Sequence, residues 1–233
     1  MDFQDLKAAY NGKIAQYGDR AYLHISELFD EIREQYKQEY LTSPKAQRLI
    51  AQGKTPDPEQ SWKPFKGHNF EKLIAYIVKE EIESLGLRVT TGDSLARKRL
   101  SPELNKVYRN LLVRYGEYAI LPDADLVIYR PGSCEVIGIV SHKITLRERV
   151  AQTAYWKLKL AADCFTCHIK GYFITTDEDG HLTKRGPEPH RNRIIVEHEL
   201  DGTYVLREVE ESEKVKSFPK FIEDLRKLVS NAR

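Results

Sequence analysis

Residues 122–159 carry the sequence PDADLVIYRPGSCEVIGIVSHKITLRERVAQTAYWKLK, and this stretch decides the predicted fold. Two runs rich in β-branched residues, 121–129 and 135–143, lie on either side of Pro131-Gly132-Ser133. Such runs joined by a turn signal are typical of an antiparallel hairpin. Residues 146–162 then return to helical composition, so we expect a hairpin followed by a helix.

The flanking segments predict further helices and strands. Apolar residues at helical spacing predict a helix over 68–85 that Gly86 ends, and a short strand follows at 87–91. Residues 102–115 are a further candidate helix. This order predicts an α/β fold, a mixed β-sheet with helices on its faces. Beyond residue 162 we expect strands at 171–176, 193–199 and 203–209 and a closing helix at 219–229.

The N-terminal part of the chain has a different pattern. Apolar positions from Tyr22 to Tyr36 keep the spacing of one helix face. Residues 43–64 then contain four prolines and a glycine, which favour a connector with at most a short helix at 46–51. We therefore predict an N-terminal helical arm and connector at 1–64, followed by a core domain at 65–233.

The composition limits the class of protein. The 233 residues include 37 Lys or Arg and 35 Asp or Glu, which argues against a uniformly basic coat protein but permits a basic face. No run of about 18 apolar residues is present, so we expect no membrane span. The three cysteines form no disulfide framework and the first residues lack the apolar core of a secretory signal, so we expect a cytoplasmic protein.

Polar residues mark the open end of the predicted hairpin. Strand side chains alternate between faces, so Asp123 and Asp125 share a face of the first strand. Ser141 and Lys143 share a face of the second strand, and His142 points to the other face. A tight turn would place Asp123 opposite Ser141 or His142, with Lys143 one step beyond. A longer turn would bring Asp125 there instead, so both aspartates are candidates.

A carboxylate and a lysine at such a position are suited to hydrolysis. The carboxylate can bind a hard divalent cation such as Mg²⁺, which prefers oxygen ligands. The metal can lower the pKa of a bound water and neutralise charge on a phosphodiester. The lysine can position or deprotonate the attacking water and stabilise the charge that builds on phosphorus. His142 is predicted to pack or to hydrogen-bond rather than to act as a base.

With Pro122-Asp123 and Lys143 in this order, the stretch resembles the PD-(D/E)xK nuclease superfamily, best represented by type II restriction endonucleases. Ser141 departs from the pattern, which has Asp or Glu there, although some of these restriction enzymes also have S-x-K. The resemblance implies a restriction-endonuclease-like fold and hydrolysis of double-stranded DNA with Mg²⁺, for which Mn²⁺ would substitute. Asp123, or Asp125, would bind the metal, and Lys143 would activate water.

The resemblance also implies a further metal ligand on a neighbouring helix. Gln152, beyond the lysine, could supply an amide oxygen, because a glutamine ligand is tolerated in parts of the superfamily. The helix before the core sheet often carries an active-site glutamate, and Glu71, at the border of the apolar stripe of helix 68–85, is the candidate here. The alternatives are a locally hydrogen-bonded glutamine and a surface glutamate.

Arg147-Glu148-Arg149, four to six residues after Lys143, resembles the R-(D/E)-R element of restriction enzymes that recognise CC and GG in the major groove. Arginine forms a bidentate pair with guanine, and glutamate accepts from cytosine. The resemblance implies a short palindromic site containing CC/GG, a homodimer with matching two-fold symmetry and a cognate DNA methyltransferase in the same system. A solvated helix start with local ion pairs is the alternative.

Two other functions remain open at this stage. A structure-specific repair or recombination nuclease of the same superfamily would cut branched DNA instead of a fixed sequence. A non-catalytic DNA-binding module would have lost its second carboxylate at Ser141. Separately, the basic segment Arg97-Lys98-Arg99 could contact phosphate groups, which position a duplex without recognising its sequence, or be an ordinary loop.

Overall fold

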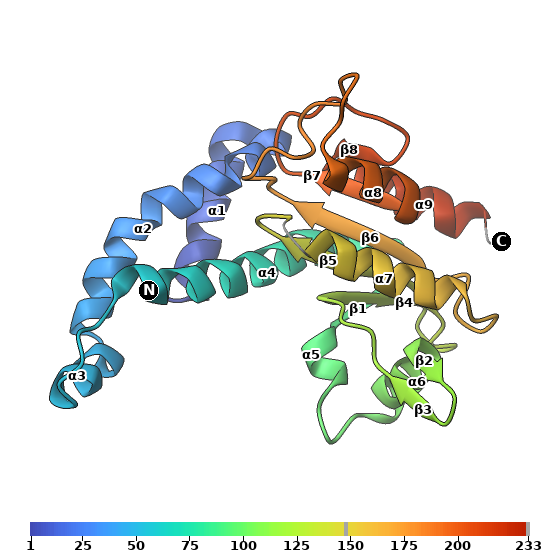
Figure 1. Ribbon diagram of the computed structural model, residues 1–233, viewed down its shortest axis with the longest axis horizontal. Helices are drawn as coiled ribbons and strands as arrows, with labels where there is room; N and C mark the ends of the chain where they lie inside the picture. The colour runs from blue at the N-terminus through green and yellow to red at the C-terminus, as the bar shows by residue number, and fades with distance from the viewer. Residues whose placement is uncertain (147–148, 232–233) are drawn as a thin grey trace. The chain divides into compact units, whose positions relative to one another are not determined.

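The computed structural model describes residues 1–146 and 149–231 and confirms the α/β class (Figure 1). Contacts within the chain divide it into two units, Met1–Ile74 and Ala75–Arg233. The division falls inside helix α4 (Pro58–Ser84), and the domain boundary after residue 64 stays a prediction. None of the helices in the described ranges is both long enough and apolar enough to span a membrane.

The N-terminal unit is helical. A capping box at Asp2 begins α1 (Phe3–Tyr17), and the 3₁₀ segment η1 (Gly18–His24) leads into α2 (Ile25–Thr42). The Ser43 side chain then caps the short helix α3 (Pro44–Ala51).

Helix α4 starts earlier than the predicted helix at residue 68. The Asp57 carboxylate accepts from the backbone N–H of Gln60 and caps the additional turns. The ring of Phe29 packs against Trp62 and Phe70 of this helix, so burial of aromatic side chains stabilises a segment whose prolines predicted a connector.

The C-terminal unit is built on a six-stranded sheet with the order β1-β4-β5-β6-β7-β8. The first three of these strands pair antiparallel, and β5 to β8 pair parallel, so the sheet is mixed as predicted. The strands are β1 (Arg88–Thr91), β4 (Leu126–Tyr129), β5 (Val136–Lys143), β6 (Lys170–Thr175), β7 (Gly202–Val205) and β8 (Val215–Ser217).

Helices form two of the three connections between parallel strands. The connection from β5 to β6 is α7 (Arg149–Ala161), the connection from β6 to β7 is α8 (Arg191–Glu199), and α9 (Lys220–Asn231) follows β8 (Figure 1). Successive side chains of β6 point to opposite faces of the sheet. Phe173 packs in one cluster with residues of α7 and α8, whereas the Tyr172 ring contacts Phe221 of α9.

The chain between β1 and β4 forms a layer of its own. It contains α5 (Gly92–Leu95), α6 (Pro102–Leu111), β2 (Val113–Tyr115) and β3 (Tyr118–Ile120), and the last two pair as a small antiparallel sheet. Apolar residues of α5 and α6 share a buried core cluster with residues of β4 and β5. The predicted helix at 102–115 therefore ends at Leu111 and gives way to a strand.

The predicted strand at 193–199 is wrong, because these residues belong to α8. His190 caps this helix by accepting from the backbone N–H of Asn192. Arg193 is fully buried and its guanidinium donates to the backbone carbonyls of Leu182 and Glu210. A buried arginine that is satisfied by distant carbonyls disturbs the apolar spacing of a helix, and the local pattern therefore suggested a strand.

Candidate active site

The open ends of β4 and β5 bring Asp125 and Lys143 together. Asp125 directly precedes β4, and Lys143 is the last residue of β5. Leu126 pairs with Val140, and the backbone N–H of Asp125 donates to the Val140 carbonyl at 3.0 Å. The antiparallel register therefore extends to Asp125 and fixes its place beside the end of β5.

The Asp125 carboxylate is held by two donors. Oδ1 accepts from Lys143 Nζ at 2.9 Å, and Oδ2 accepts from the backbone N–H of His142 at 2.7 Å. Only 16% of the Asp125 side chain and 23% of the Lys143 side chain are exposed, so solvent screens this pair less than a surface pair. An ionised carboxylate has about four lone-pair sites, so Asp125 retains capacity to bind a further group.

The structure corrects the expected place of Asp123. The ladder between β4 and β5 shifts by a residue between Ile128 and Tyr129, where β5 forms a bulge. The ladder ends where Leu126 pairs with Val140, and beyond this end the ion pair with Lys143 is made by Asp125 and not by Asp123. The alternative of a longer hairpin, which the sequence left open, is therefore the one that the structure supports.

Asp123 lies in a separate cluster with the first turn of α7. Its Oδ2 accepts from Gln152 Nε2 at 2.6 Å, and Gln152 Oε1 accepts from Arg149 Nη1 at 2.8 Å. Arg149 Nη1 is also 3.9 Å from Asp123 Oδ2, and 60% of the Asp123 side chain is exposed. Three residues that the sequence singled out are thus in contact, in a more solvated setting than Asp125.

His142 is fully buried between these groups and the core. Burial, together with the nearby charge of Lys143, lowers the pKa of His142 to about 4, although Asp125 acts in the opposite direction. The imidazole is therefore neutral near pH 7. The complete burial of the side chain agrees with the prediction that His142 packs.

The remaining predicted residues are Glu71, Ser141, Arg147 and Glu148. Glu71 is a half-buried residue of α4 in the N-terminal unit, whereas the two clusters above consist of residues of the C-terminal unit. Its role as a ligand stays a prediction. Arg147 and Glu148 lie outside the described residues, and Ser141 is buried in β5.

The oxygen donors at this edge suit a hydrated cation. In the described part of the chain, no three His, Cys, Asp or Glu side chains are grouped so that they could hold a metal ion. The available donors are the carboxylates of Asp123 and Asp125 and the Gln152 amide. Mg²⁺ in proteins usually keeps several water ligands and is bound through one or two carboxylates and substrate phosphates. A small number of protein oxygens, as present here, therefore matches the usual coordination of Mg²⁺.

Gly92, at the start of α5, supports Asp125 through the backbone. Its N–H donates to the Asp125 carbonyl at 3.3 Å, and the preceding strand β1 pairs Thr91 with Leu126. A Cβ on Gly92 would lie 2.1 Å from the Ala124 carbonyl oxygen, which only glycine avoids. Sequence reasoning missed this residue, and the available signal was a glycine directly after a predicted strand.

Comparison with known proteins gives the family. The model of the type 2 restriction endonuclease family BsaWI matches residues 103–230, which is more than half of the chain. A protein of Methanocaldococcus jannaschii that is named as the type II restriction enzyme MjaVIP is 39% identical over 212 residues. The matched region covers 87% of this chain and 92% of that protein.

Two solved structures share the fold at low sequence identity. The complex of restriction endonuclease PspGI with substrate DNA is 14% identical, covers 97% of this chain and 93% of that one, and has a TM-score of 0.53. The AgeI–DNA complex is also 14% identical, covers 97% and 91%, and has a TM-score of 0.51. These likenesses confirm the restriction-endonuclease-like mixed sheet. The family match and the 39%-identical relative show that this chain is an enzyme of the BsaWI family of type 2 restriction endonucleases.

Proposed function

We propose that this enzyme is a type II site-specific deoxyribonuclease that hydrolyses double-stranded DNA with Mg²⁺ at a short palindromic site containing CC/GG. The observation that carries the proposal is the Asp125–Lys143 pair at the open end of the β4–β5 hairpin. Membership of a restriction endonuclease family supports cleavage of DNA at a defined site.

Lys143 is the group that would act on the phosphodiester. The oxygen of a water molecule attacks phosphorus, and the bond from phosphorus to the 3′ oxygen breaks. The departing oxygen takes the electron pair and a proton, which leaves a 3′-hydroxyl and a 5′-phosphate. The Lys143 ammonium would orient the water and stabilise the charge on the phosphoryl oxygens, while Asp125 keeps the ammonium in position.

Asp125 would be the principal metal ligand, with Asp123 and Gln152 as further oxygen donors. A bound Mg²⁺ supplies a more acidic water and neutralises charge on the phosphodiester. Mn²⁺, which also binds carboxylate and water ligands, would substitute. Glu71 remains the candidate ligand from the N-terminal unit.

Arg147, Glu148 and Arg149 would recognise bases. Arg149 is the first residue of α7 and its side chain, 47% exposed, reaches the Asp123 cluster, so this segment ends next to the candidate active site. The guanidinium fork matches guanine, and a carboxylate accepts from cytosine. A homodimer would present two such segments to a palindrome, and a cognate methyltransferase would protect the same sequence in the host.

Digestion of a plasmid of known sequence tests the proposal. We expect discrete fragments with Mg²⁺ or Mn²⁺, none with EDTA, and sequenced ends that lie within or beside CC/GG. Lys143→Ala should lower the cleavage rate by roughly 10³-fold or more, because the charge on phosphorus loses its cationic partner. The matched control is Lys227→Ala, which removes an exposed lysine of α9 and should leave the fragments unchanged.

Two outcomes would contradict the proposal. A Mg²⁺-dependent smear, or cleavage of branched DNA alone, would indicate a nuclease without a fixed site. Binding of DNA without cleavage under any condition would show that the chain has lost catalysis.

A further inference from the structure

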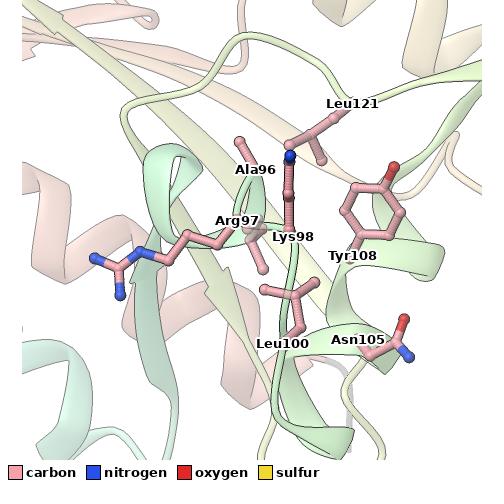
Figure 2. Close-up of a pocket in the computed structure, with 8 residues that line it drawn as sticks. Ala96, Arg97, Lys98, Leu100, Asn105, Tyr108 and Leu121 are labelled. Atoms are coloured by element: carbon pink, nitrogen blue, oxygen red, sulfur yellow. The ribbon is translucent and has the colours of Figure 1, made fainter.

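A pocket of about 480 Å³ opens in the layer between β1 and β4 of the C-terminal unit (Figure 2). Its lining has two kinds of side chain: leucines form an apolar part, and a lysine, an amide and a phenol form a polar part. The leucines are Leu95, Leu100 and Leu121, and the polar residues are Lys98, Asn105 and Tyr108.

Positive charge is concentrated around this pocket. Residues 92–115 contain six Lys or Arg against two Asp or Glu, whereas the whole chain has 37 against 35. Arg97, Lys98 and Arg99 are exposed, and none of the three has an ion pair or a hydrogen bond to another residue of the part that the structure describes. Three adjacent cations without acidic partners favour an anionic ligand over an internal role.

The pocket is connected to the candidate active site through the backbone. Leu121 precedes Asp123 by two residues, and α5, whose Leu95 lines the pocket, shares a buried core cluster with Ala124. At the start of the same helix, the N–H of Gly92 donates to the Asp125 carbonyl. A polyanion held at the candidate active site would therefore also meet this basic layer.

We infer that the pocket binds a sugar–phosphate unit of the DNA backbone to one side of the cleaved bond; the inference rests on the proposed function. Figure 2 shows Lys98 and Tyr108 extending in the same direction, with Lys98 pointing towards Leu121, whereas Arg97 extends away from them. The Lys98 ammonium and the Tyr108 hydroxyl would donate to phosphate oxygens, and the half-buried Leu100 and Leu121 would pack against the deoxyribose. The volume is in the range of small-molecule sites and exceeds what a single phosphate needs.

A phosphate contact has a signature that a contact to a base lacks. Loss of a phosphate contact weakens binding to all sequences alike. It also lowers the dependence of affinity on salt, because fewer counterions are released. Fluorescence anisotropy in EDTA would measure the affinity of the full chain for two duplexes, one spanning a cut site and one without it, over a range of salt concentrations.

We expect Lys98→Ala to weaken binding to both duplexes by the same factor, roughly tenfold, and to reduce the slope of log K against log salt by about 1. Lys98→Arg should retain the slope because it keeps the charge. Tyr108→Phe should weaken both duplexes by a smaller common factor, with an unchanged slope. Lys227→Ala, in the helix that follows β8 at the other edge of the sheet from β1, is the charge-matched control.

The outcomes separate this inference from the proposed function. A wild-type protein that binds and cuts DNA, together with an unchanged slope in Lys98→Ala, would overturn the pocket inference alone. A loss confined to the duplex with the cut site would also overturn it, since that result indicates base recognition. A wild-type protein that neither binds nor cuts DNA would overturn the proposed function and this inference with it.

Discussion

The C-terminal unit contains two carboxylate–lysine pairs of nearly the same geometry. Lys143 Nζ lies 2.9 Å from Asp125, and Lys157 Nζ lies 2.8 Å from Asp201. All four side chains are less than a quarter exposed. Distance and burial alone would therefore assign both pairs the same role.

Their places in the sheet distinguish them. Asp201 directly precedes β7 and lies beside the start of β6, where it accepts from the backbone N–H of Gly171 and pairs with Lys170. Lys157 also donates to the Ile169 carbonyl. This pair joins α7 to the start of β6. Lys143 lies at the carboxyl end of the parallel strand β5, which is where ligands bind in sheets of this kind. Under the proposed function, the strand end and the neighbouring groups, more than the ion pair itself, make Lys143 the candidate catalytic residue.

Replacement of the two aspartates by asparagine tests this comparison most directly. Asp125→Asn should lower the cleavage rate by roughly 10³-fold, because it removes the charge that positions Lys143 and that, under the proposed function, would bind the metal. Asp201→Asn should leave cleavage near the wild-type rate and destabilise the fold by about 2 kcal/mol, because a charged hydrogen-bond partner is lost. Cleavage assays and urea unfolding measure the two effects, and equal losses of activity would contradict the distinction.

The exposed cluster of Asp123, Gln152 and Arg149 allows a test of base recognition. Arg149→Lys keeps the charge but loses the planar fork, so discrimination against a single-base change in the site should fall by roughly 10- to 100-fold. The ratio of cleavage rates on the two duplexes measures this. Arg226→Lys, at an exposed position of α9, is the matched control, and an equal effect there would count against recognition by Arg149.

Backbone support of Asp125 can be broken without touching a polar side chain. Gly92→Ala should destabilise the protein by about 1–3 kcal/mol, because a Cβ 2.1 Å from the Ala124 carbonyl oxygen forces the segment before β4 to move. Cleavage should fall further than stability predicts. Gly67→Ala, on α4 with open space at the added Cβ, should be neutral or stabilising by up to about 1 kcal/mol. Urea unfolding measures the stability of both variants, and equal free energies of unfolding would contradict the prediction.

Acid stability is the smallest of the expected effects. Burial opposes ionisation of Asp201, but the hydrogen bonds from Lys157 and Gly171 outweigh it and hold the pKa of Asp201 below its ordinary value. The folded state therefore favours the ionised form. The stabilisation is present above the unfolded-state pKa of about 3.9 and is lost as the pH falls through the folded-state value. Unfolding free energies between pH 7 and pH 3 should fall less steeply in Asp201→Asn, and parallel curves would disprove this.

Most of the core architecture follows from local sequence. The hairpin around Pro131-Gly132-Ser133, the helix α7 and the strand β6 lie where periodicity and turn residues predict them, because each depends on neighbours in the chain. The pattern failed at α8, where the buried Arg193 bonds to carbonyls from two distant segments. It also missed β8, whose three residues are too short for a periodic signal.

The sequence by itself determined the α/β class, the order of the elements and the small set of polar residues from which the candidate active site is drawn. Tertiary structure decided which of them meet. The pairing of β4 with β5 places Asp125 beside the end of β5, where its carboxylate meets Lys143, and the backbone N–H of Gly92 donates to the Asp125 carbonyl. Periodicity acts over a few residues, whereas the register is set by hydrogen bonds and packing between strands, so the local pattern does not determine which aspartate meets Lys143.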